Sequence, residues 1–428
     1  MTRTELITES GESLKIIYTG RVNDGQGADF RDAVISIDNR VIRGDIEIHV
    51  KASDWWAHNH HRNPAYNRVV LHVVMWDDDK QATTLQNGRN IPILALYRYQ
   101  HLSDEPRYSS RVVSTTLCPA STKHRMVGRQ LAELDKAGER RFFTRVAAFR
   151  AEFGEKEPAQ SLYRGIMGAL GYLKNKKPFT ELADLLPYRI LKSEVNRSVS
   201  DEECLARQQA LLLGTAGLLP SQESSQHLSW LSNSWLEKVE ISWLSCSDNA
   251  TMPPGYWHFF KVRPNNSPVH RLLAMSYLVM RFRKQGLLNE LVGMIKKVRF
   301  NSFCGNLERE LKVVCDDYTA GTTGDTAPYR KGSVTLLGSH RAADIIINVI
   351  LPFTCAWGQS ILQPVLVEKA LALYRAHSRM AVNSIEKHMK KQLGLSNKMV
   401  NSARRQQGLI HLYQTLCIKG RCNDCPLS

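Results

Sequence analysis

The sequence lacks the features of exported, membrane-spanning and disulfide-stabilised proteins. No apolar run approaches the roughly 18 to 20 residues that cross a bilayer, and the first residues, MTRTELITESGESLKIIY, lack the apolar segment and the cleavage site of a secretory signal. The nine cysteines are odd in number and mostly scattered, which does not suit a disulfide framework. These absences predict a soluble protein of the reducing cytoplasm without a membrane partner.

Acidic residues are few relative to basic ones. The chain has 57 Lys and Arg against 41 Asp and Glu, which gives a formal net charge of +16 at pH 7. Such an excess favours polyanionic partners, because binding to a polyanion releases its condensed counterions. We therefore expect nucleic acid, either DNA or RNA, as the partner. The 428 residues are enough for two or three domains with a large core.

The character of the chain changes near residue 119. Before it, short β-branched or alternating runs separated by turn residues predict strands over 15–20, 29–38, 43–50, 67–76 and 90–99. A short helix is expected to begin at Ser53 or Asp54 and to end before Pro64. After it, long amphipathic patterns predict helices, for example over 128–153 and 158–175. We therefore expect an α+β protein with a mixed β-sheet domain (1–118), a helical domain (119–370) and a basic helical C-terminus that carries a Cys cluster (371–428).

Four polar residues in the predicted sheet form a candidate catalytic centre. Residues two apart share one face of a strand, so Glu47, His49 and Lys51 point to the same side. Asp29 opens the preceding strand, where a hairpin would bring its carboxylate beside Glu47. Two carboxylates from neighbouring strands suit Mg²⁺ or Mn²⁺ with a phosphate oxygen as a further ligand. In this interpretation Asp29 and Glu47 bind the metal, His49 activates water and Lys51 stabilises developing charge.

This order of residues resembles the PD-(D/E)XK nuclease superfamily, in which an Asp at the start of one strand precedes Asp/Glu-x-Lys on the next, followed by a helix and another strand. The matching words are ADF, with Asp29, and EIH, with Glu47 and His49. Ala28 stands where the motif has proline, and His49 stands where it has lysine. The resemblance implies a restriction-endonuclease-like sheet and hydrolysis of phosphodiester bonds in nucleic acid.

The histidines of the same region allow a second interpretation. In a regular helix Asp54, His58 and His61 share one face, at i, i+4 and i+7, while His60 points elsewhere. Zn²⁺ or Mn²⁺ binds such nitrogen and oxygen ligands, in either a hydrolytic or a structural site. A further alternative is that these histidines are ordinary surface and core residues packed beside tryptophans. The candidate ligands, besides Asp29, are Glu47, His49, His58, His60 and His72.

The C-terminal segment carries two further candidate sites. Cys417, Cys422 and Cys425 form a C-x4-C-x2-C pattern, which with a fourth ligand such as His411 would hold Zn²⁺ or an Fe–S cluster. Residues 371–428 contain ten Lys and Arg against two acids. A solvated helix face is one interpretation of these charges, and a surface that follows phosphates is the other. The candidate nucleic-acid-binding residues are Lys387, Lys390, Lys391, Arg404 and Arg405.

Longer phrases across nearly the whole chain, among them GRVNDGQGADFRDAVISID and RPNNSPVHRLLAMSYLV, resemble an uncharacterised bacterial domain-of-unknown-function family. That resemblance implies a bacterial cytoplasmic protein and no particular activity. The function predicted from the residues is a metal-dependent nuclease. The alternative is a non-catalytic nucleic-acid-binding or scaffold protein in which the polar cluster is structural. A metallohydrolase of another class would leave the excess charge unexplained.

Overall fold

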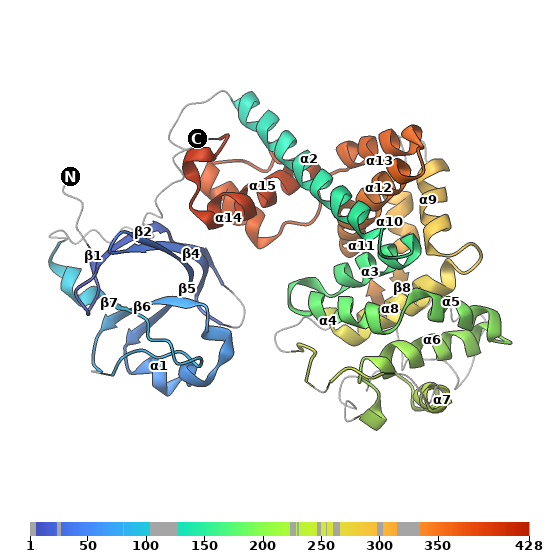
Figure 1. Ribbon diagram of the computed structural model, residues 1–428, viewed down its shortest axis with the longest axis horizontal. Coiled ribbons are helices and arrows are strands. Elements are labelled where there is room, and N and C mark those ends of the chain that lie inside the picture. The colour runs from blue at the N-terminus through green and yellow to red at the C-terminus, as the bar shows by residue number, and fades with distance from the viewer. Residues whose placement is uncertain are drawn as a thin grey trace. The chain divides into compact units, whose positions relative to one another are not determined.

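The chain forms two units (Figure 1). Unit 1 contains Met1–Gly138, Val382–Asn401 and Arg405–Ser428, and unit 2 contains Glu139–Ala381 and Ser402–Arg404. Most of the expected C-terminal segment 371–428 is thus grouped with the sheet, while the expected boundary at 118 lies outside the described residues. This computed structural model describes residues 6–23, 27–79, 81–102, 127–222, 228, 231–245, 250–253, 255–259, 266–297, 303–314 and 334–427.

Unit 1 is built on a mixed sheet, which has seven strands among the described residues. β5 pairs with β4 in antiparallel and with β6 in parallel orientation, and β6 and β7 are also parallel. Strands are present in all five expected regions, and the mixed α+β class is confirmed. The strand order is β1 (Leu6–Ile7), β2 (Ser13–Tyr18), β4 (Phe30–Ile37), β5 (Arg40–Lys51), β6 (Val69–Trp76) and β7 (Ile93–Ala95), with β3 (Arg21–Val22) paired to β4.

The hairpin of β4 and β5 contains a tight turn and a bulge. Asp38 and Asn39 both have positive φ, 45° and 64°, as a two-residue turn between twisted strands requires. Residues 33–37 then pair one for one with 44–40, but Phe30 pairs with Ile46, so β4 carries one extra residue before Ala33. Asp32 lies in this bulge with φ 60°. A left-handed residue is typical of such bulges, which bend a strand and redirect its side chains.

The parallel crossover from β5 to β6 is made of short turns and not of one helix. α1 spans only Asp54–Ala57, and 3-10 turns follow at His60–Arg62 and Pro64–Tyr66. The break comes at Asn59, which has φ 57°. Asparagine tolerates this left-handed conformation better than most residues, so the helix stops there. The expected continuous helix face of Asp54, His58 and His61 is therefore wrong.

The C-terminal helices of unit 1 share an apolar cluster with the first part of α2 (Val127–Glu152). α14 (Ser384–Leu393) begins after Asn383, whose side chain accepts a hydrogen bond from the Glu386 amide at 2.8 Å. It ends at Gly394, with φ 66°. β2 contributes Tyr18, whose hydroxyl lies 2.6 Å from His388 Nε2. The buried members of this cluster are Leu134, Ala137, Met389, Leu393, Leu395, Val400, Leu409, Leu412, Tyr413 and Leu427.

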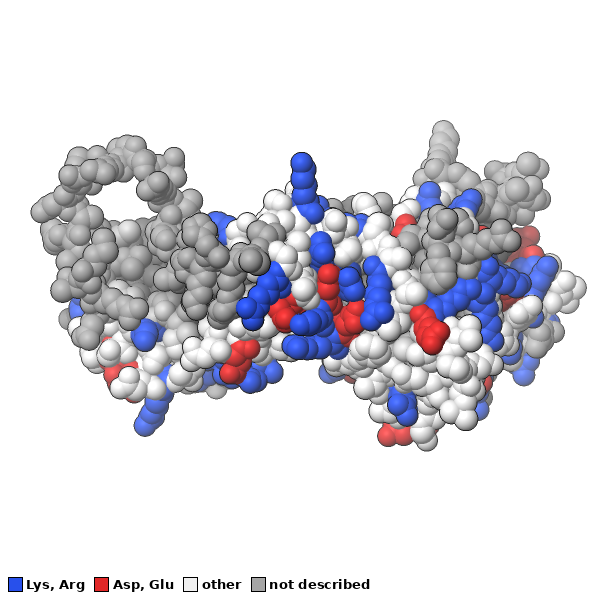
Figure 2. Space-filling view, turned by 90° about the horizontal axis from the view of Figure 1, so that it is seen from above, with Lys and Arg blue, Asp and Glu red and all other residues white. Residues whose placement is uncertain are grey.

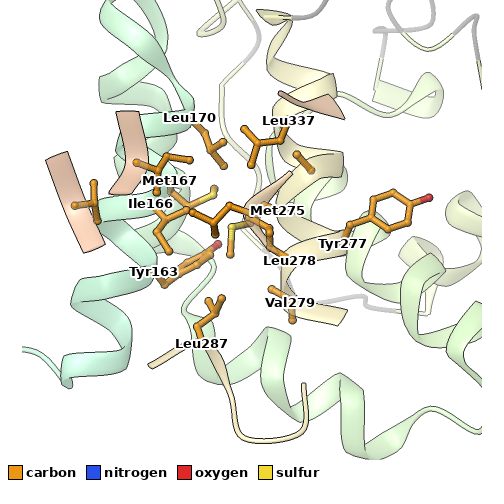
Figure 3. Close-up of a cluster of buried hydrophobic side chains, with 14 of the residues drawn as sticks. Tyr163, Ile166, Met167, Leu170, Met275, Tyr277, Leu278, Val279, Leu287 and Leu337 are labelled. Carbon is orange, nitrogen blue, oxygen red and sulfur yellow. The ribbon is translucent and has the colours of Figure 1, made fainter. Parts of the chain in front are cut away.

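Unit 2 is helical. Leu170 near the end of α3 and Leu278 of α8 belong to its large apolar core, where side chains of the two helices meet (Figure 3). The helix expected over 158–175 is interrupted at Gly171, where α3 ends and α4 starts. The elements are α3 (Pro158–Leu170), α4 (Tyr172–Leu185), α5 (Tyr188–Arg197), α6 (Asp201–Thr215), α7 (Asn233–Leu244), α8 (Pro268–Arg281), α9 (Leu287–Lys297), α10 (Phe303–Leu311), β8 (Val313–Val314), β9 (Thr335–Leu337), α11 (Ser339–Ile345), α12 (Leu351–Ser360) and α13 (Pro364–Ala376).

One stretch of unit 2, Ser339–Ser360, is long and apolar enough to cross a membrane by length and composition. It joins α11 and α12 through a π-helical turn at Ile346–Ile350. Of its apolar window, 78% is buried inside the protein, as in the core helix of a helical domain. Asp344 and Asn348 interrupt the apolar sequence here, which is why the sequence shows no uninterrupted run. Among the residues that the structure describes, no other helix meets the same test.

Candidate metal centre

The β4–β5 hairpin brings Asp29 and Glu47 together. The Asp29 amide donates a hydrogen bond to Glu47 Oε2 at 2.9 Å, and the Ile48 amide donates one to Asp29 Oδ2 at 3.0 Å. Each carboxylate is thus held by the backbone of the opposite strand. Burial and repulsion from Glu47 raise the pKa of Asp29 above its ordinary value. A carboxylate of this kind is a better proton acceptor than an exposed one.

Two histidines lie beside the second oxygen of Glu47, and a third lies beside one of them. Glu47 Oε1 lies 3.6 Å from His49 Nε2 and 3.4 Å from His60 Nε2, and His58 Nδ1 lies 3.2 Å from His49 Nε2. The ligand nitrogens of the three histidines all lie within 4.8 Å of one another. We call Glu47, His49, His58 and His60 the four-ligand cluster. Among the described residues, these histidines are the one group of three or more metal-binding side chains gathered so closely.

The left-handed residue Asn59 explains why both His58 and His60 belong to the cluster. In a continuous helix the two side chains would point to different sides, but the break at Asn59 turns both toward β5. His61 instead packs on Trp56, with ring centroids 4.6 Å apart. His58 is exposed whereas His49 and His60 are largely buried. The cluster therefore opens to solvent on the side of His58.

A chain of hydrogen bonds holds His49 from behind. His49 Nδ1 lies 2.9 Å from His72 Nε2, and His72 Nδ1 lies 3.0 Å from Thr83 Oγ1. Burial, together with the neighbouring histidines, lowers the pKa of His72 to about 3. His72 is therefore neutral at neutral pH and is placed to orient the ring of His49, while its expected role as a direct ligand stays a prediction. Such partners of ligating histidines fix the tautomer and the ring orientation.

Burial also lowers the pKa of His49, although Glu47 acts in the opposite direction. A neutral imidazole is the form that binds metal ions. Tyr66 stacks on His60 with ring centroids 3.9 Å apart, and burial and the two carboxylates raise its pKa to about 12. Thr83 was not among the candidate residues predicted from the sequence. A threonine in a loop has no sequence pattern that marks it as a hydrogen-bond partner, and only the structure shows that it contacts His72.

A protein-family model described as "Protein of unknown function (DUF2851)" matches residues 1–380. The chain belongs to the DUF2851 family. No curated protein and no solved structure matches the chain. The range matched by the DUF2851 model contains the whole four-ligand cluster, whereas Cys417, Cys422 and Cys425 lie beyond it.

Lys51 lies apart from the four-ligand cluster. Its ammonium is 3.8 Å from a carboxylate oxygen of Asp78, and its side chain is largely exposed. The backbone amide of Lys51 also points away from the cluster, since it donates a hydrogen bond to Asp54 Oδ2 at 3.1 Å. The contacts of Lys51 therefore do not support the expected role in stabilising developing charge, which stays a prediction.

Of the three C-terminal cysteines, only Cys422 and Cys425 are seen close to each other among the described residues. Cys422 and Cys425 belong to one tight turn, in which the Cys425 amide donates to the Cys422 carbonyl at 3.1 Å. Burial and the Cys425 thiol raise the pKa of Cys422. Cys417 Sγ contacts Met389 Sδ at 3.9 Å. Among the described residues the three do not form a group within metal-binding distance. A Zn²⁺ or Fe–S site here stays a prediction.

The basic residues of the C-terminus differ in their surroundings. Arg405 forms ion pairs with Asp135 in unit 1, and Arg404 forms one with Glu139 in unit 2. Lys390 pairs with Glu386, whereas Lys387 and Lys391 are exposed. On the face shown in Figure 2, Asp and Glu side chains lie among Lys and Arg. Several of these charges are thus neutralised within the protein, and a phosphate-binding role for them stays a prediction.

Proposed function

We propose that unit 1 binds a divalent transition-metal ion through the four-ligand cluster and hydrolyses phosphodiester bonds of nucleic acid. The observation that carries this proposal is the close grouping of His49, His58 and His60, with Glu47 beside His49 and His60 and held against Asp29. Two ligand atoms that share one metal at about 2.1 Å lie about 3.0 to 3.4 Å apart. The separations of 3.2 Å between His58 and His49, and of 3.4 and 3.6 Å from Glu47 to His60 and His49, are close to this range.

The ligand set favours a particular class of metal. Imidazole nitrogens select transition metals, whereas Mg²⁺ prefers oxygen ligands and water. Four protein ligands leave two positions open on a six-coordinate Mn²⁺ or Fe²⁺, one for water and one for a phosphate oxygen. A Zn²⁺ ion held tetrahedrally by all four would have no open position and would be structural. The identity of the bound metal therefore discriminates between a catalytic site and a structural one.

The residues around the cluster have separate roles in the proposed reaction. A bound metal ion polarises the phosphoryl group and lowers the pKa of water. Asp29 accepts the proton as the water oxygen attacks phosphorus, the bond to the leaving oxygen breaks, and that oxygen takes a proton from solvent. We assign this base role to Asp29 and not to His49, because His49 Nε2 is a ligand of the proposed metal and His49 Nδ1 faces His72.

Two further features support the proposal. β2, β4 and β5 are antiparallel and β6 follows in parallel after a crossover, with Asp29 before β4 and Glu47-x-His49 on β5. This is the strand order that the PD-(D/E)XK resemblance implies, with a crossover of short turns in place of the usual helix. The net charge of +16 favours a polyanionic substrate.

The test combines metal analysis with cleavage assays. The full chain is purified without chelators, its metal content is measured, and labelled single-stranded and duplex DNA and RNA are incubated with it and Mn²⁺, Fe²⁺, Mg²⁺ or Zn²⁺. Glu47→Gln and His58→Ala should lose metal and cleavage together. His61→Ala is the matched control, because His61 lies on the same turn but outside the cluster, and it should keep both. Equal, background cleavage by wild type and Glu47→Gln, with one tightly bound Zn²⁺ in the wild type, would establish the structural alternative.

A further inference from the structure

Tyr172 occupies an unusual position at the junction of α3 and α4 in unit 2. Its φ is 57°, in the left-handed region, where a side chain larger than hydrogen costs about 1 to 2 kcal/mol. The junction is nevertheless firmly built. Leu170 before it is buried in the core, and Asn175 after it exchanges two hydrogen bonds with the backbone of His258, at 2.9 and 2.8 Å. The fold thus holds Tyr172 in this conformation although its ring remains 47% exposed.

The ring of Tyr172 lies against a buried cation. The guanidinium carbon of Arg341, on α11, is 3.0 Å from the ring centroid, and Arg341 is only 8% exposed. Arg341 Nη1 donates to the Ala169 carbonyl and pairs with Asp344, but Nε and Nη2 have no hydrogen-bond partner. A buried arginine is costly when its donors are unpaired, so the stacking on Tyr172 is its main compensation on that side. One face of the ring is covered by Arg341.

Further cations belong to the same part of unit 2. Arg141 and Arg145 of α2 and Lys176 of α4 are close enough to affect one another, and burial and mutual repulsion lower the pKa of Arg145 and of Lys176. Asp344 is the acid that pairs with Arg341, and burial raises its pKa. Lys176 is exposed on the first turns of α4, four residues after Tyr172. An exposed aromatic ring with an exposed lysine on the same helix is a combination that single-stranded nucleic acid recognises.

We propose that Tyr172 is a stacking platform for an unpaired base of single-stranded nucleic acid, with Lys176 contacting an adjacent phosphate and Arg341 holding the ring from below. A base within a duplex has both faces covered by its neighbours, so the platform selects single strands. This inference rests on the proposed function for its ligand class, but it requires neither a metal nor catalysis. It can therefore be tested in the absence of both.

The experiment is fluorescence anisotropy of the full chain in EDTA with a labelled single-stranded oligonucleotide and with the corresponding duplex. Tyr172→Gly removes the ring and suits the left-handed backbone, so loss of binding cannot come from added strain. We expect the affinity for single strands to fall about 5- to 100-fold, the effect of one lost base stack, and Tyr172→Phe to stay near wild type. Lys176→Gln should reduce the salt dependence of binding by about one phosphate contact.

Leu362→Gly is the matched control. Leu362 also belongs to unit 2, has φ 53° and is 86% exposed, but it offers no aromatic ring. The Leu362→Gly variant should bind the single-stranded oligonucleotide with the affinity of the wild type. Equal affinity of Tyr172→Gly and wild type, or no preference of the wild type for single strands, would overturn the platform. Metal content and cleavage by Glu47→Gln report on unit 1 independently of this binding assay.

Discussion

Asp29 lies opposite Glu47 because β4 contains one extra residue. If residues 33–37 set the register for the whole hairpin, Asp29 would face Ile48, whose side chain belongs to the other side of β5. The bulge around Asp32 shifts the pairing by one, so that Phe30 pairs with Ile46 and Asp29 reaches Glu47. The bulge therefore creates the acidic pair beside the four-ligand cluster. β-Bulges commonly redirect side chains in this way next to active sites.

Asp29→Asn should separate metal binding from hydrolysis. The substitution keeps the shape and the Oδ acceptor for the Ile48 amide, but it removes the proton acceptor. We expect metal content close to wild type and a fall in the cleavage rate of about 10²- to 10⁴-fold, the usual contribution of a positioned general base. Metal analysis and single-turnover cleavage measure the two effects. Unchanged cleavage by Asp29→Asn would remove Asp29 from the mechanism.

His72→Phe should weaken metal binding without removing a ligand. His72 is fully buried and its Nε2 is the partner of His49 Nδ1, so phenylalanine fills the space but leaves the His49 ring without its orienting bond. Loss of such a partner typically lowers metal affinity about 10- to 100-fold. Competition with a fluorescent chelator measures this affinity. Thr83→Val, one step further along the chain of hydrogen bonds, should give a smaller loss, and the reverse order would contradict the proposed arrangement.

Asn59→Gly and Asn59→Val should have opposite outcomes. Asn59 is exposed and holds His58 and His60 in place through its left-handed conformation. Glycine adopts this conformation freely, whereas a β-branched residue resists it by about 1 to 2 kcal/mol. Asn59→Gly should therefore keep the metal affinity of the wild type, and the metal affinity of Asn59→Val should be about tenfold lower. Similar affinities of the two variants would show that the break at Asn59 does not organise the cluster.

Local patterns predicted part of the structure and could not predict the rest. Alternation along residues 43–50 placed Glu47 and His49 on one face, because the strand period is a local property. No local pattern marks the bulge at Asp32, and an asparagine such as Asn59 is common inside helices as well as at their ends. The approach of Tyr18 to His388 joins residues 370 positions apart, a contact that only the tertiary fold decides. The sheet, the helical region and the candidate histidines were therefore predictable, and the break at Asn59 that turns His58 and His60 to the same side was not.

His388 should make the stability of unit 1 depend on pH. Burial, with Arg21 and Lys391 nearby, lowers its pKa to about 4, while its ring nitrogen lies 2.6 Å from the Tyr18 hydroxyl and its ring packs near Tyr413. In the unfolded chain the pKa of histidine is about 6.5. Between these values the unfolded chain binds the additional proton, so the free energy of unfolding should fall as the pH drops from about 6.5 to about 4.

The expected loss is on the order of 2 kcal/mol, allowing for the partial exposure of the ring. Urea unfolding of wild type and His388→Gln at pH 7, 5.5 and 4.5 measures it, because glutamine keeps a polar partner for Tyr18 but does not titrate. The difference in stability between the two proteins should shift by this amount in favour of His388→Gln as the pH falls. The other titrating groups of unit 1 are common to both proteins and cancel in the difference. Parallel stability curves would mean that His388 is protonated in the folded protein as readily as in the unfolded chain.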